Sequence, residues 1–127
     1  MEGGTILEPI ALTVSLRGTY EVAENHQVFF LKGQLDAFSE PVFRKVIGKY
    51  VDEGPIHVIL DLSTIDFIDS SGLGALVQIA KKCQGRNGTF QAVSNARVTQ
   101  TVKLVRLESF LNLRASLPEA LEHIPQA

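Results

Sequence analysis

The amino-acid sequence predicts a single-domain α/β protein, with a mixed sheet of four or five strands layered against about four helices. Residues 56–62 form a nearly continuous apolar run, which is typical of a strand buried on both faces. Amphipathic helical patterns precede and follow this run. The elements follow the order β-β-α-β-α-β-α-β-α, and strand–helix–strand units favour parallel neighbours joined by right-handed crossovers. The length of 127 residues suits one domain.

The amino-terminal part of the chain predicts an antiparallel hairpin. Residues 1–10 show no strong periodicity and are expected to be a frayed lead-in to a domain that spans residues 11–127. Residues 11–16 alternate between apolar and polar side chains, as a half-buried strand does. Residues 27–31 are rich in β-branched and aromatic side chains and predict a second strand. The polar residues 18–26 predict a long connection between the two.

A helix and the central strand follow. Ser39 can cap a helix with Pro41 in its first turn, since proline is tolerated where the N–H group would be unpaired anyway. Apolar residues then recur at helical spacing until Gly54 and Pro55 stop the helix. The apolar run at 56–62 comes next and is expected to be internal to the sheet.

The remaining elements alternate between helices and short strands. A second helix is expected to start within residues 69–72, and residues 89–93 predict a strand. Asn95 can cap a third helix. Residues 111–115 predict a short edge strand, and residues 118–123 predict a final helix.

Charge and hydropathy exclude several classes of function. Twelve basic and fourteen acidic residues give a net charge of −2, so direct nucleic-acid binding, which depends on neutralised phosphates, is not expected. The longest apolar stretch, residues 28–31, is far shorter than the ~20 residues that span a bilayer, and no membrane insertion is expected. Because the first residues lack the pattern of a secretory signal, a cytoplasmic location is expected.

Cysteine and histidine usage predicts neither a disulfide nor a metal site. Cys83 is the single cysteine and cannot form an intramolecular disulfide. The three histidines are scattered and lack the spacing of metal ligands. No metal and no cofactor is therefore expected.

Residues 60–74, which read LDLSTIDFIDSSGLG, hold the candidate functional chemistry. A buried strand is expected to end at residue 62. The loop that follows, residues 63–68, is expected to hold Ile65, Phe67 and Ile68 against the core, and a helix then begins with small hydroxyl residues. Small residues at a helix start leave the backbone N–H groups uncovered, and these groups together with the helix dipole favour negative charge. A serine in this place can be reached by another protein, and the fold would tolerate a phosphate on it.

The same residues also have a purely structural interpretation. Asp69, Ser70 and Ser71 are residue types that helices prefer as N-caps. Gly72 and Gly74 could simply permit close packing against a neighbouring loop. From spacing alone, capping is the commoner role of such residues.

The segment FIDSSGLGAL after an apolar strand resembles the signature of the STAS domain, specifically of the anti-sigma factor antagonist (anti-anti-sigma factor) family. Residues 33–36, GQLD, resemble that family's Gly-Glu-Leu-Asp element, with Gln34 in place of the usual glutamate. The similarity covers about residues 12–124. It implies a single STAS-like domain and a non-enzymatic regulator of transcription.

The resemblance also implies a partner-switching cycle. In its unmodified form such a protein binds an anti-sigma factor that has serine kinase activity, and so frees the sigma factor. The kinase phosphorylates the serine directly after the motif aspartate, here Ser70, and a serine phosphatase later resets the switch. The same resemblance implies a partner-binding role for Asp36, Asp69, Ser71 and Gly72. Gln34 stands where the family has a glutamate, so this surface has one negative charge fewer, and this difference concerns the identity of the partner.

Two other functions compete with this interpretation. Catalysis is not expected: Gly72 and Gly74 match the first two glycines of a dinucleotide fingerprint, but Val77 occupies the third position, and no Walker motif is present. The surroundings of Ser70 also differ from the G-x-S-x-G pattern of a nucleophilic serine. The stronger alternative is a STAS module that never cycles, a structural subunit of a signalling or lipid-transport complex. The modifiable hydroxyl after Asp69 favours the phosphorylation switch.

Overall fold

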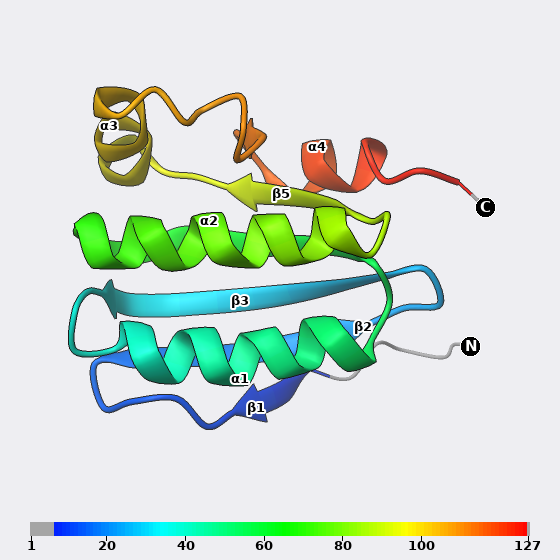
Figure 1. The fold of residues 1–127 in the computed structure, drawn as a ribbon, viewed down its shortest axis with the longest axis horizontal. Helices are drawn as coiled ribbons and strands as arrows, with labels where there is room; N and C mark the ends of the chain where they lie inside the picture. Colours follow the sequence, from blue (N-terminus) through cyan, green and yellow to red (C-terminus); the bar gives the residue numbers. More distant parts are fainter. Residues whose placement is uncertain (1–6, 127) are drawn as a thin grey trace.

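The computed structural model describes residues 7–126, which form a six-stranded sheet and four helices (Figure 1). The strands are β1 (Glu8–Ile10), β2 (Leu16–Val22), β3 (His26–Leu35), β4 (His57–Ile68), β5 (Thr89–Val93) and β6 (Leu113–Arg114). The helices are α1 (Glu40–Glu53), α2 (Ser70–Gly85), α3 (Ala96–Leu104) and α4 (Leu117–Glu122).

The sheet is mixed, as the sequence predicted, although it has six strands where four or five were expected. Its spatial order follows the chain from β1 to β6. The first three strands pair antiparallel, and β3 to β6 pair parallel. β4 lies between β3 and β5, which confirms that the apolar run at 56–62 is internal to the sheet.

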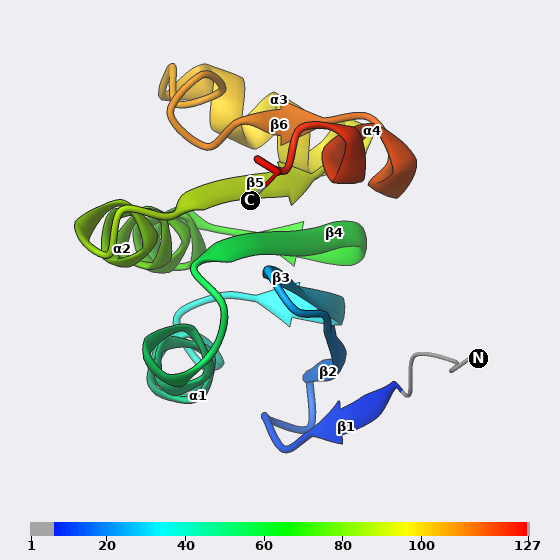
Figure 2. The ribbon, with the colours of Figure 1, turned by 90° about the vertical axis from the view of Figure 1, so that its right-hand side faces the viewer.

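The helices cover the two faces of the sheet unequally. α1 and α2 lie side by side on one face, and α4 packs on the other (Figure 2). The main core lies beneath α1 and α2, and α3 adds Val98 and Val102 to it. A smaller apolar cluster beneath α4 contains Val28, Ile59 and Val93. No helix within residues 7–126 is long and apolar enough to cross a membrane.

The amino-terminal hairpin differs from the predicted one. Residues 11–16 were expected to form a strand and residues 18–26 a long connection, but β2 begins only at Leu16 and a short turn then joins it to β3. The reason is a contact distant in sequence. The ring of Tyr20 packs against Phe29, with centroids 5.5 Å apart, and against Tyr50 of α1, with centroids 4.6 Å apart. This aromatic packing places residues 18–22 in β2, although their sequence resembles a polar turn.

Part of the expected lead-in also belongs to the sheet. Glu8–Ile10 forms the edge strand β1, and Ile10 is buried opposite Gly18 of β2. The prediction of a frayed segment was therefore wrong for these three residues. Residues 1–6 lie outside the described part of the chain.

The central strand is longer than predicted. Residues 63–68, expected to be a loop, continue β4 because β3 also extends and pairs with them as far as the Leu35–Ile68 pair. On its other side, β4 extends beyond β5, because the pairing of the two strands ends at Asp61 of β4. There the side-chain amide of Asn95 donates a hydrogen bond to the Ile65 carbonyl at 2.9 Å. Asn95 also caps α3, as predicted.

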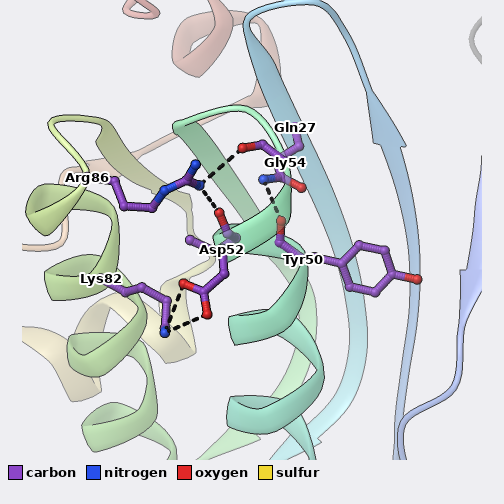
Figure 3. A network of polar contacts seen from close by, with 7 residues as sticks. Gln27, Tyr50, Asp52, Gly54, Lys82 and Arg86 are labelled. Carbon is purple, nitrogen blue, oxygen red and sulfur yellow. Dashed lines mark hydrogen bonds and ion pairs between the residues drawn. The ribbon is translucent and has the colours of Figure 1, made fainter.

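The carboxyl end of α1 is held by side chains from two other elements (Figure 3). The amide of Gln27 in β3 donates to the Tyr50 carbonyl at 3.1 Å. It also donates to the Pro55 carbonyl at 2.9 Å. The guanidinium of Arg86, just after α2, donates to the carbonyls of Val51 and Gly54. Because α1 has no basic residue in its own last turn, Arg86 supplies the cation at this helix end. The Tyr50 carbonyl also accepts the Gly54 N–H at 2.9 Å, so Gln27 adds a second hydrogen bond to it.

We expect Arg86→Met to destabilise the fold by about 1–3 kcal/mol, because it keeps an apolar stem and removes charge-assisted hydrogen bonds to two carbonyls. The measurement is the denaturant midpoint, with the m-value unchanged. Arg97→Met is the matched control, since Arg97 is exposed on α3 and its side chain makes no hydrogen bond to another described residue. Equal midpoints for the two variants would contradict the capping role of Arg86.

Candidate functional site

The start of α2 lies at the carboxyl ends of β3 and β4, next to the loop that joins β3 to α1 (Figure 1). The backbone N–H of Asp69 donates to the Leu35 carbonyl at 3.3 Å. Gly72 in the first turn of α2 lies over the same carbonyl, and a Cβ atom built on Gly72 would be 2.2 Å from the Leu35 oxygen. The first turn of α2 therefore contacts the backbone of β3 directly, and only glycine fits at position 72.

Asp69 joins the two segments of this site through its carboxylate. One oxygen accepts a hydrogen bond from the Gly72 N–H at 2.9 Å, which caps α2. The other oxygen accepts from the N–H of Ala37 in the β3–α1 loop at 3.2 Å. The capping interpretation of this motif is thus correct for Asp69. It does not apply to Ser70 or Ser71, whose hydroxyls make no hydrogen bond within residues 7–126.

The β3–α1 loop is stabilised by a reciprocal pair of hydrogen bonds between Asp36 and Ser39. The Asp36 carboxylate accepts from the N–H groups of Phe38 and Ser39, each at 3.0 Å, and the Ser39 hydroxyl accepts from the Asp36 N–H at 3.1 Å. This is the geometry of a capping box. The expected cap role of Ser39 was therefore wrong: its hydroxyl is buried and turns back to the loop, donating to the Gln34 carbonyl at 2.8 Å.

Ser70 is the first residue of α2, and its side chain is exposed. Its neighbours on both sides have structural roles, since Asp69 caps the helix and Gly72 makes the buried contact. Ser71 is half-buried. The structure therefore brings the five predicted residues Asp36, Asp69, Ser70, Ser71 and Gly72 to one end of the molecule, and it presents the Ser70 hydroxyl to solvent.

Two aromatic residues of this surface were not identified from the sequence. Phe38 in the β3–α1 loop is 72% exposed, and Phe67 near the end of β4 is 45% exposed. Phe67 was expected to be held against the core, which was wrong. Exposed aromatic side chains are typical of protein-binding surfaces. The available signal was the position of Phe38, which lies in a short segment between Asp36 and Ser39 where Ala37 is the one other apolar residue.

The surroundings of Ser70 do not resemble a catalytic centre. His26 and His57 face each other at the opposite, amino ends of β3 and β4, so neither can act as a base for Ser70. Cys83 is buried, and burial raises the pKa of its thiol to about 12, which keeps it protonated. Within residues 7–126, no three side chains of the metal-binding types come together.

The chain belongs to the STAS domain family, whose family model matches residues 19–120. The TM1081 homolog of Thermotoga neapolitana is 28% identical over 107 residues, which cover 83% of this chain and 95% of that protein. The anti-sigma-F factor antagonist RsfB of Mycobacterium tuberculosis is 29% identical over 106 residues, 81% of this chain and 86% of RsfB. The crystal structure of an anti-sigma factor antagonist from Mycobacterium paratuberculosis superposes with a TM-score of 0.78 and 25% identity, over 87% of this chain and 94% of that one.

The two glycines of the motif should respond in opposite directions to alanine. Gly72→Ala places a Cβ against the backbone of Leu35, and we expect a loss of about 1–3 kcal/mol. Gly74→Ala meets no atom within 4 Å, and we expect a gain of roughly 0.5–1 kcal/mol, because alanine is favoured over glycine inside a helix. Denaturant unfolding measures both. Equal shifts would show that the first turn of α2 does not approach β3 as described.

Proposed function

We propose that the chain is a cytoplasmic anti-sigma factor antagonist that works by partner switching. In the unphosphorylated state it binds an anti-sigma factor with serine kinase activity. That kinase phosphorylates Ser70 and is thereby released, and a serine phosphatase restores the binding state. The observation that carries the proposal is the Ser70 hydroxyl, which is exposed and makes no hydrogen bond within the described residues, at the first position of α2.

The binding surface consists of the β3–α1 loop and the start of α2. Asp69 and the close approach of Gly72 to Leu35 tie these segments together, so a partner meets a preformed surface. Phe38 and Phe67 supply exposed aromatic area. One oxygen of the Asp36 carboxylate accepts hydrogen bonds from the Phe38 N–H and from the N–H and hydroxyl of Ser39. The other oxygen accepts none within residues 7–126 and is available to a cation of the partner.

The electrostatics of α2 explain why phosphorylation would release the partner with little effect on the fold. A phosphate adds about −1.5 to −2 charges at neutral pH. In the free protein the positive end of the α2 dipole offsets part of this charge, by about 0.3–1 kcal/mol. At a docked interface the same charge next to the Asp69 carboxylate must be desolvated, which is costly unless a cation of the partner meets it.

Gln34 alters this surface without altering the fold. Its side chain is exposed, and its backbone supplies the structural contacts. The Gln34 N–H donates to the Ser15 carbonyl at 2.9 Å, and its carbonyl accepts from the Ser39 hydroxyl. Since either glutamine or glutamate can make these backbone hydrogen bonds, the change acts on partner choice through the loss of one negative charge.

We expect Ser70→Ala to abolish phosphorylation while leaving partner binding and stability nearly unchanged. Because Asp69 is the cap and the Ser70 hydroxyl has no hydrogen-bond partner among residues 7–126, the free energy of unfolding should change by no more than about 0.5 kcal/mol. Ser70→Asp adds one negative charge, less than a phosphate carries, and should weaken binding only in part. Ser71→Ala is the control, because it removes the adjacent hydroxyl.

The experiment incubates each purified variant with candidate anti-sigma factor kinases and Mg-ATP, locates phosphate by mass spectrometry and titrates binding of the unmodified proteins. Phosphate on Ser71 in place of Ser70 would move the site by one residue. No phosphate on any variant, with binding insensitive to Ser70→Asp, would support the alternative, a non-cycling STAS subunit of a signalling or lipid-transport complex.

A further inference from the structure

A basic groove of about 620 Å³ is lined by residues of α1 and α2. These two helices lie side by side on one face of the sheet (Figure 2). Five basic side chains line the groove: Arg44, Lys45 and Lys49 from α1, and Lys81 and Lys82 from α2. Two acidic side chains also line it, so its net charge is +3, whereas the whole chain carries −2. Positive charge is therefore concentrated on one face of an otherwise acidic protein.

Three of these cations have no acidic partner within the described residues. Arg44 pairs with Glu40, and Lys82 pairs with Asp52 at 3.1 Å (Figure 3). Lys45, Lys49 and Lys81 form no ion pair in residues 7–126. Lys45 and Lys49 also stand four residues apart on α1, where like charges repel and cost about 0.2–0.5 kcal/mol. A bound group that carries negative charge would relieve this repulsion.

Gly48 lines the groove at the point where α1 meets the Lys82 side chain of α2. It lies in the middle of α1, where glycine is less favourable than alanine by about 0.5–1 kcal/mol. The packing between the helices does not require it, because an added Cβ would only reach ordinary contact with Lys82 Cε, at 3.5 Å. Gly48 is buried, so the absence of a side chain lets Lys82 lie against α1 in the wall of the groove.

We propose that the α1–α2 groove is a second docking surface, whose partner is an acidic segment of a protein with two or three carboxylates set against Lys45, Lys49 and Lys81. Lys81 lies eleven residues after Ser70, about 17 Å along α2, so this part of the groove is distant from Ser70. The proposal does not depend on phosphorylation of Ser70.

Two other anionic partners fit the groove less well. Helices that bind membrane surfaces place large apolar side chains beside their cations, but none of the large exposed hydrophobic residues of the described chain lines this groove. A nucleic acid carries a continuous run of negative charge, which Asp52 and Glu53 within the groove would oppose. A short acidic segment can place its carboxylates at the lysines and avoid both acidic residues.

The test uses the full chain and a fluorescein-labelled hexaglutamate peptide, with binding followed by fluorescence anisotropy at low salt. The groove variant combines Lys45→Gln, Lys49→Gln and Lys81→Gln. The matched control combines Lys32→Gln, Arg97→Gln and Lys103→Gln, which are exposed cations outside the groove. Each variant loses three positive charges from −2 and so carries −5. We expect the groove variant to bind at least about tenfold more weakly and the control to change less than about twofold.

Peptide-induced shifts of backbone amide resonances should map to α1 and α2, and Ser70→Asp should leave the peptide affinity within about twofold. Equal weakening of both triple variants would overturn the proposal, because it would indicate a general charge effect. Absence of peptide binding by the unmodified chain would overturn it as well. Retention on phosphatidylserine vesicles through the groove lysines, without peptide binding, would assign the groove to a membrane surface and refute the acidic-segment partner.

Discussion

The first turn of α2 lies so close to the Leu35 carbonyl that no side chain fits at position 72. This approach brings Asp69 within reach of the β3–α1 loop, where its carboxylate accepts the Ala37 N–H while it also caps Gly72. The exposure of Ser70 follows from these contacts. Asp69 occupies the cap and Gly72 occupies the buried position, so the residue directly after the cap is turned toward solvent.

The residues that stabilise the site are different from the residue proposed to regulate it. The hydrogen bonds that hold the site belong to Asp69, Asp36 and the backbone, and none of them involves the Ser70 hydroxyl. A change at Ser70 therefore alters surface charge and leaves packing intact. On the proposed function, a reversible switch requires this, because a modification that destabilised the fold would unfold the protein as well as release the partner. Phe38 and Phe67 then provide contact area that is present in both states.

Sequence reasoning succeeded where the signal is local and failed where it depends on distant neighbours. The strand Thr89–Val93, the Asn95 cap and the start of α2 were predicted because each depends on residues a few positions apart. β2 was misplaced because its Tyr20 packs against a residue of α1. Of the site, the motif residues were predicted, whereas the exposure of Phe38 and Phe67 was not, since hydrophobic patterns predict burial and only tertiary structure shows what covers a side chain.

The distribution of charge gives the two surfaces different electrostatic characters. The groove between α1 and α2 carries +3, which leaves −5 for the rest of the chain. The Ser70 end contributes Asp36, Asp66 and Asp69 to that negative part, so a phosphate there would increase an existing asymmetry. At physiological salt, interactions between exposed charges are screened beyond about 8 Å, and Lys81, which forms no ion pair within residues 7–126, lies about 17 Å from Ser70 along α2. A charge added at Ser70 is therefore screened from Lys81. On the proposed function, a phosphate at Ser70 would release the partner bound there and leave the electrostatics at the Lys81 end of the groove unchanged.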